Sequence, residues 1–218
     1  MKKIILVLGL VSIFFVQGQV YEFESTENDQ VLHHRILMDD NYIIETIFQE
    51  NPSVFILTRG GFYQKDGVII KSDFEFNSNH EKDQLKSYSW DSNSWKANEN
   101  LTQALDGKWL MAGRVKPEGE QRRDITRSRK TMKFLIDGYF QWTAFNTETF
   151  QFFGSGGGHY KAIEGTYVEE IGYFSRDNSR AGASLSFEYD RKGKDWYHKG
   201  LSSKGKPLHE IWTLRPKN

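Results

Sequence analysis

Cysteine is absent from the 218 residues of this chain. Its absence excludes disulfide bonds, a thiol nucleophile and lipid attachment through a cysteine thiol. A chain without cysteine tolerates an oxidising compartment, but packing of its core must then supply its stability.

An excess of either charge is also lacking, because Lys and Arg number 29 and Asp and Glu number 29. A nucleic-acid-binding protein normally carries a strong basic excess, so we expect no nucleic-acid partner. Prolines number only 4, whereas aromatic residues make up 15% of the chain. Aromatic-rich segments separated by glycine turns are typical of an all-β protein.

A long apolar run occurs only at the start of the chain, over residues 4–16. Lys2 and Lys3 precede it, and it is too short to span a bilayer. We therefore predict a secretory signal peptide over residues 1–18, with the exported chain beginning at Gln19. A buried N-terminal helix is the alternative. We expect a secreted or periplasmic protein without a transmembrane segment.

An internal repeat is the most informative feature that is present. Residues 42–63 match residues 139–160 without a gap, at a constant offset of 97 positions. The identical pairs are Asp40/Asp137, Tyr42/Tyr139, Thr46/Thr143, Phe48/Phe145, Phe55/Phe152, Gly60/Gly157, Gly61/Gly158 and Tyr63/Tyr160, and one residue of slippage adds Gly67/Gly165 and Phe76/Phe174. A repeat of about 100 residues has the size of a domain, which indicates a duplicated β module.

Period-two alternation and Gly, Asp or Asn turns predict the strands. The first half has six, at about 20–25, 31–38, 42–49, 54–64, 67–77 and 84–90. The second half has eight, at about 107–114, 130–136, 139–146, 150–163, 166–175, 182–190, 195–202 and 208–215. In the strand at 139–146, Phe140, Trp142 and Ala144 should share one face.

We therefore predict two tandem, antiparallel, up-and-down β-barrel modules after the signal peptide. Residues 19–104 form the first, abbreviated module, and residues 105–218 form the second, complete eight-stranded module. Because the first module lacks counterparts of the final strands, it is either a short barrel or borrows strand edges from its neighbour.

The second module carries a Gly-x-Trp motif at Gly107–Trp109 and ends on a strand that closes with Arg215. This pair resembles the signature of the lipocalin (calycin) family, in which an arginine lies across the tryptophan at the closed end of the barrel. The resemblance implies structural roles for Trp109 and Arg215 through a cation–π contact. In the first module, Tyr21 or Phe23 replaces the tryptophan. The whole chain is also similar to uncharacterised bacterial secreted proteins with two such modules.

An eight-stranded barrel holds either packed side chains or one small ligand. The leading hypothesis is an exported binding protein for a small, partly apolar molecule. We predict that the ligand-binding residues are Trp142, His159, Tyr160 and Tyr173 in the cavity and Arg176 and Arg180 at its rim.

Two segments near these residues admit two interpretations each. The glycine run at residues 154–158 lacks the Lys-Ser/Thr of a phosphate loop, so it marks either a bend in a strand or a gap that faces a ligand. The basic residues between 122 and 130 form either a cationic lid over the mouth or an ordinary solvated loop.

No pattern of histidines or carboxylates predicts a metal site, and no Gly-x-Ser-x-Gly motif predicts a nucleophile. His33 and His34 are adjacent on a strand and therefore point to opposite faces, so they cannot bind one metal ion together. His198 is a further histidine of interest. We predict no cofactor and no catalytic residue. The alternatives to a binding protein are a cell-envelope scaffold with filled barrels and a protein partner or, less favoured, a hydrolase or isomerase.

Overall fold

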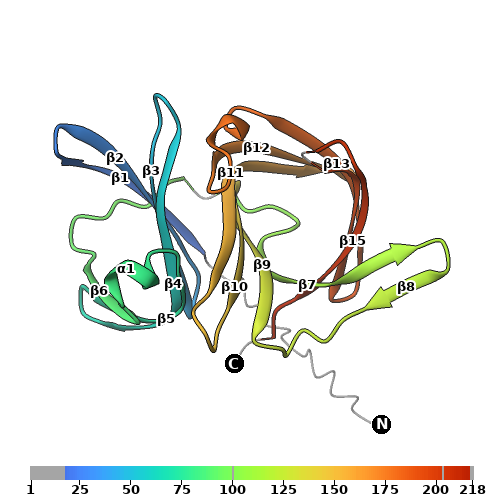
Figure 1. Ribbon diagram of the computed structural model, residues 1–218, viewed down its shortest axis with the longest axis horizontal. Coiled ribbons are helices and arrows are strands. Elements are labelled where there is room, and N and C mark those ends of the chain that lie inside the picture. The colour runs from blue at the N-terminus through green and yellow to red at the C-terminus, as the bar shows by residue number, and fades with distance from the viewer. Residues whose placement is uncertain (1–17, 100, 203, 217–218) are drawn as a thin grey trace, which may run out of the picture.

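The structure is a computed structural model that describes residues 18–99, 101–202 and 204–216. It confirms the all-β prediction, since the described residues form fifteen strands, one short α-helix and one 3-10 helix. The strands build two sheets that lie side by side, a curled sheet at the left of Figure 1 and a closed barrel at the right. The predicted signal peptide, apart from Gly18, lies outside the described residues.

The barrel contains eight antiparallel strands and closes where its last strand pairs with its first. Its strands are β7 (Gly107–Lys116), β9 (Arg129–Ile136), β10 (Tyr139–Asn146), β11 (Phe152–Ile163), β12 (Thr166–Phe174), β13 (Ser184–Lys192), β14 (Asp195–Leu201) and β15 (Pro207–Leu214). A short strand that the sequence did not predict, β8 (Gly119–Arg122), folds back on β7. This closed barrel is compatible with a lipocalin-like fold.

The first module is an open sheet of six strands that curls without closing. Its strands are β1 (Gln19–Glu27), β2 (Gln30–Met38), β3 (Tyr42–Gln49), β4 (Val54–Asp66), β5 (Ile69–Asn77) and β6 (Ser87–Asp91). Beyond β6, Trp95 packs on Tyr21 and Phe23, with ring centroids 5.2 and 6.0 Å away, and Ala97 bridges Tyr21. The module is therefore neither a short barrel nor completed by strands of its neighbour.

Strand pairing shows that the repeat extends beyond the segment in which the two copies share identical residues. Strands β2–β6 correspond to β9–β13, and the offset of 97 positions holds in every strand pair between them. The slippage expected from the sequence is wrong: Gly60 pairs with Phe76 and Gly157 pairs with Tyr173, so Phe76 and Tyr173 occupy equivalent positions.

Both copies carry a β-bulge at the same place, and glycine is required there. A Cβ added to Gly61 would lie 2.0 Å from the carbonyl oxygen of Asp73, and one added to Gly158 would lie 1.9 Å from that of Glu170. Both distances are far inside van der Waals contact. The glycine run in β11 thus permits the close approach of β12 at the bulge.

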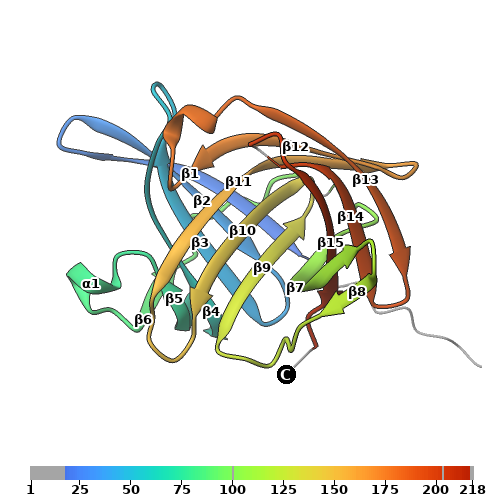
Figure 2. The same cartoon turned by 45° about the vertical axis from the view of Figure 1, so that its right-hand side comes forward.

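The two sheets pack through equivalent faces. Figure 2 shows β9–β11 layered against the strands of the curled sheet. Phe48 packs on Tyr173 with ring centroids 5.1 Å apart, and the equivalent rings of Phe145 and Phe76 lie 4.8 Å apart. Phe55 stacks on its own counterpart Phe152 at 6.2 Å. The contact surface therefore matches itself, as in a two-fold symmetric interface.

The signature arginine does not occupy the place that the lipocalin resemblance implied. Arg215 crosses to the curled sheet, where it makes two hydrogen bonds of 2.7 Å to the carboxylate of Glu75 and lies over the ring of Tyr42. Arg191 lies over the indole of Trp109 instead, with its Cζ 5.2 Å from the ring centroid. Arg215 therefore joins the two modules, and Arg191 covers the tryptophan.

Candidate functional site

A cavity of about 280 Å³ lies inside the barrel. It is lined by side chains of the barrel strands and opens at the barrel end where β12 and β14 finish. Its apolar lining residues are Met111, Trp142, Ile171, Phe174, Ala183, Leu185, Phe187, Leu208 and Trp212, and its polar ones are Thr131, Lys133, Glu169, Arg180, His198, Ser202 and Glu210.

The opposite end of the barrel is filled. Trp109 and Trp196 are completely buried there, with ring centroids 5.7 Å apart. The indole N–H of Trp109 donates to the carbonyl oxygen of Leu105, in the segment that precedes β7. The position of the Trp142 indole in the cavity wall depends on Gly156, because a Cβ at that residue would lie 2.7 Å from Nε1 of Trp142.

A buried ion pair lies in the wall of the cavity. Nζ of Lys133 donates to Oε1 of Glu169 at 2.6 Å, and the hydroxyl of Tyr167 donates to the same oxygen at 2.8 Å. Burial, followed by the Glu169 carboxylate, raises the pKa of Tyr167 well above its ordinary value, so its hydroxyl keeps its proton. The ammonium also lies 5.2 Å from the ring centroids of Trp196 and Trp212. Lys133 is thus held rigidly.

His198 and Glu210 form the second polar group of the cavity. His198 is 2% exposed, and neither of its ring nitrogens has a hydrogen-bond partner among the described residues. Its Nδ1 lies 3.5 Å from Oε2 of Glu210, longer than a normal hydrogen bond. The same carboxylate oxygen accepts from Nε1 of Trp212 at 3.2 Å.

Protonation states follow from burial and from the charge of Lys133. Burial, then the Lys133 ammonium, lowers the pKa of His198, so the imidazole is neutral and offers one donor and one acceptor. Burial alone would raise the pKa of Glu210, but His198 and Lys133 outweigh it, and the pKa falls below its ordinary value. The cavity therefore presents a neutral imidazole beside an ionised carboxylate.

Two of the six residues predicted from the sequence line this cavity. Trp142 projects inward from β10, as the alternation predicted, and packs edge-on against Phe174 with ring centroids 5.4 Å apart. Arg180 lies at the rim, with Nε 3.3 Å from a carboxylate oxygen of Asp177. A third, Tyr160, is buried at the filled end, where its hydroxyl donates to Asp106.

The other three lie outside the barrel. His159 is exposed beside the ring of Tyr139, and the exposed Arg176 donates to the carbonyl oxygen of Phe153 at 2.7 Å. Tyr173 faces the curled sheet and donates to Oε1 of Gln141 at 2.8 Å. Burial raises the pKa of Tyr173 to about 12. The bulge causes this orientation, because the extra residue Gly172 reverses the alternation after Ile171.

Of the polar residues that line the cavity, only Arg180 was among the ligand-binding residues predicted from the sequence. The sequence did contain a signal for two of the others. His198 lies two positions from Trp196 on β14, and Glu210 lies two positions from Trp212 on β15. A polar residue two positions from a buried tryptophan shares its inward face.

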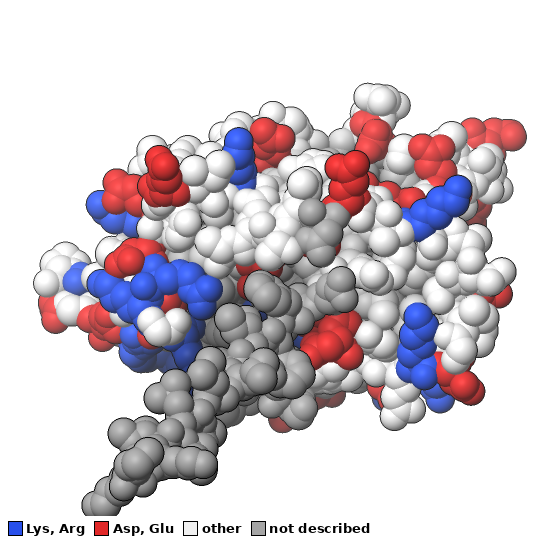
Figure 3. Space-filling model, turned by 180° about the vertical axis from the view of Figure 1, so that it is seen from behind, with Lys and Arg blue, Asp and Glu red and all other residues white. Residues whose placement is uncertain are grey.

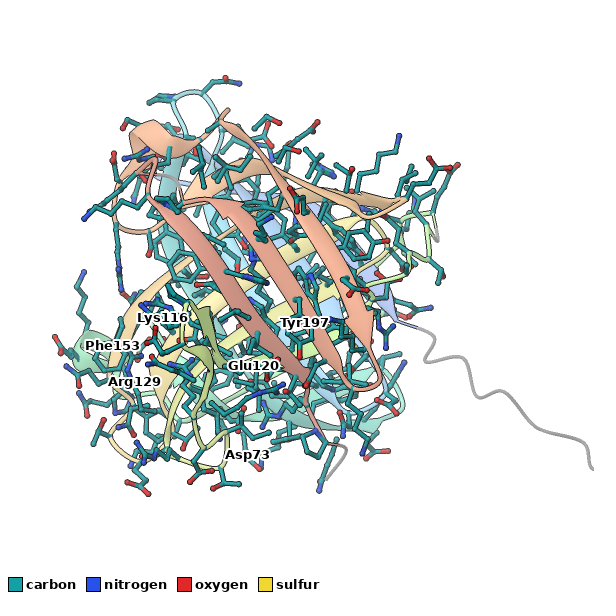
Figure 4. The ribbon with its side chains drawn as sticks, turned by 90° about the vertical axis from the view of Figure 1, so that its right-hand side faces the viewer. Asp73, Lys116, Glu120, Arg129, Phe153 and Tyr197 are labelled. Carbon is teal, nitrogen blue, oxygen red and sulfur yellow. The ribbon has the colours of Figure 1, made fainter. Side chains whose placement is uncertain are left out.

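The basic segment contributes no described residue to the lining of the cavity. Arg122 is held on the outer wall, where Nη1 donates to Asp195 at 2.8 Å. Figure 4 shows Tyr197 on this wall close to Glu120, to which its hydroxyl donates at 2.6 Å. Seen from behind in Figure 3, Lys and Arg side chains gather at the side from which the β7–β8 hairpin projects.

A comparison of the chain with protein-family models finds no match, and neither does a comparison with curated proteins. Within the described ranges, no group of three or more His, Cys, Asp or Glu side chains could hold a metal ion. Of the helices in the same part of the chain, none has the length and hydrophobicity needed to cross a membrane.

Proposed function

We propose that this chain is an exported binding protein that holds one small, partly apolar molecule inside its barrel. The observation that carries the proposal is the buried imidazole of His198, which faces the cavity without a hydrogen-bond partner among the described residues. Leaving a buried polar group unpaired costs about 1–3 kcal/mol, and a ligand that bonds to it recovers this cost. The volume of about 280 Å³ is close to the lower end of known ligand pockets, about 300 Å³.

Binding would bury the apolar part of the ligand and orient its polar group. Met111, Leu185 and Trp212 offer apolar surface for the body of the ligand, while His198 and Glu210 fix its polar group. The Lys133–Glu169 pair keeps its geometry through its own hydrogen bonds, so the wall loses little freedom when a ligand binds.

Export is supported by the position of the first strand. β1 begins at Gln19, the first residue after the proposed cleavage site. We propose a secreted or periplasmic location. N-terminal sequencing of the protein purified from its natural source tests it, since the processed chain should start at Gln19 and an uncleaved Met1 would contradict it.

Native mass spectrometry of the same preparation tests the binding function. One small molecule bound to each chain is the expected result, and extraction then identifies it. Ala183→Trp should abolish the bound mass, because Ala183 lines the cavity. Ser184→Trp is the matched control, since Ser184 is the next residue and is exposed, so that it should retain the ligand. Loss in both variants, or no bound molecule in the unmodified protein, would favour the scaffold alternative.

A proton-transfer enzyme is the second candidate, and one observation favours it. A neutral imidazole beside an ionised carboxylate is a suitable general base pair, and His198 and Glu210 form such a pair in the cavity. Incubation of the extracted molecule with fresh protein in deuterium oxide tests it. Deuterium incorporation that stops in His198→Gln would support an enzyme, and an unchanged mass would exclude proton transfer to that molecule.

A further inference from the structure

The four charged side chains that line the cavity, Lys133, Glu169, Arg180 and Glu210, differ in how closely they are paired. Lys133 is paired with Glu169 at 2.6 Å, and Arg180 is paired with Asp177 at 3.3 Å. Glu210 remains without a comparable partner in the described part of the chain.

The cations around Glu210 act on its carboxylate without a close ion pair. The Lys133 ammonium helps to lower the pKa of Glu210, but it donates its hydrogen bond to Glu169. Nη2 of Arg114 comes only within 4.0 Å of Glu210, and the Arg114 side chain is 64% exposed, so water screens that contact. His198 is neutral and adds no positive charge. Trp212 supplies one N–H donor to a carboxylate that has about four acceptor positions. A carboxylate removed from water normally has a cationic partner. Glu210 is only 15% exposed and has no close partner of this kind among the described residues, so it is the group that a ligand would pair with.

We propose that the ligand carries a protonated amine that pairs with Glu210 while its apolar body lies against the aromatic wall of the cavity. This inference rests on the proposed binding function and adds the chemical class of the ligand.

Two features of the cavity fit an ammonium group. The carboxylate supplies an ion pair, and the acceptor nitrogen of His198 can take a second N–H. A carboxylate ligand would face the like charge of Glu210, and an alcohol would make no ion pair.

The volume limits the size of the amine. At about 30 Å³ per water molecule in the liquid, the cavity of about 280 Å³ holds the equivalent of about nine waters. We therefore expect an amine with a single ring or a short branched chain, and not a lipid or a pigment.

Benzylamine, benzyl alcohol and benzoate provide a matched set of probes, since they share one ring and differ in their polar group. Binding of each is measured at pH 7 by ligand-detected NMR and by calorimetry on the unmodified chain. Benzylamine should bind at least tenfold more tightly than benzyl alcohol, and benzoate should bind more weakly than both.

Glu210→Gln should remove the preference for the amine while leaving the affinity for benzyl alcohol within about threefold, because glutamine can still accept from Trp212. Glu188→Gln is the matched control: it removes one carboxylate from the outer wall, where the Glu188 side chain is 76% exposed, and should keep the preference. Thermal unfolding establishes that both variants are folded.

The outcomes separate the inference from the function on which it rests. Equal affinities for the amine and the alcohol, or tighter binding of benzoate, would overturn the amine inference and leave a binding protein. Failure of all three probes to bind at millimolar concentration would overturn both. The comparison of probes on the unmodified chain remains decisive even if Glu210→Gln does not fold.

Discussion

The two copies of the repeat place their buried charges at different positions on the same backbone. In the barrel, Lys133 and Glu169 form the ion pair, and the equivalent residues of the curled sheet, 97 positions earlier, are Ile36 and Ser72. The curled sheet instead pairs Arg59 with Glu45 at 2.7 Å. The barrel residues equivalent to these two are Gly156 and Trp142.

This exchange shows that the two copies fill the same point of the fold differently. The curled sheet is filled at this point by the side chain of Arg59, whose Cζ lies 3.9 Å from the ring centroid of Tyr88. The barrel has Gly156 there, and the indole of Trp142 packs directly against it. A glycine in place of an arginine thus changes the filling of this point, with the register of the equivalent strands unchanged.

The largest effect is expected from copying the barrel's glycine into the curled sheet. Arg59→Gly leaves the buried carboxylate of Glu45 with only His34, 3.2 Å away, as a partner. Removing one member of a buried pair costs about 3–5 kcal/mol, which urea unfolding would measure. The double variant Glu45→Trp with Arg59→Gly should recover more than half of this loss.

Arg127→Gly is the control for this prediction, since that side chain is 74% exposed and its removal should cost less than about 1 kcal/mol. A loss of the same small size for Arg59→Gly would show that the ion pair contributes nothing to the curled sheet.

A smaller effect is expected from the arginines that distinguish this barrel from the lipocalin signature. Arg215→Met should cost about 2–4 kcal/mol, because Glu75 loses its two hydrogen bonds from Arg215 and keeps only the one from the Tyr42 hydroxyl. Arg191→Met should cost only about 1 kcal/mol, the cation–π contact with Trp109. Urea unfolding of both variants measures the difference. A larger loss of stability in Arg191→Met than in Arg215→Met would favour the role that the lipocalin resemblance implied for Arg215.

The smallest effect concerns the β9–β10 turn. Burial, followed by the nearby Asp106 carboxylate, raises the pKa of Asp137 from 3.8 to about 6. The folded state therefore holds this proton more tightly than the unfolded chain, and stability falls as the pH rises from about 4 to about 6. Asp137→Asn removes this cost and should raise the melting temperature by roughly 2–4 °C above pH 6, with little gain at pH 4.

Asp29→Asn is the control for this change. Asp29 is exposed and has the same left-handed backbone, with φ of 62° against 50° for Asp137. Asparagine favours that conformation at both sites. An equal gain in both variants would assign the effect to the backbone preference and not to the charge.

The sequence predicted the fold well because period-two patterns and turns are local signals. Phe140 and Trp142 share the inward face, as their spacing required. The site was harder to predict, since the partners of a buried charge come from strands far apart. Nothing local to Lys133 shows that Glu169 lies across the barrel from it, and nothing near Tyr173 shows that a bulge turns it outward.

The two modules meet through a surface that resembles a dimer interface, but they belong to one chain. Two separate chains would need a strong, largely apolar contact to stay associated, whereas residues 92–106 connect these halves directly. A short linker provides an effective concentration on the order of millimolar, so a weak contact is enough. The centre of the interface can then be polar: Gln141 bonds there to Thr46 at 2.7 Å and to Thr58 at 2.8 Å. Because the two modules are covalently connected, their contact surface need not be strong enough to hold a dimer together. The residues of the two copies can therefore differ.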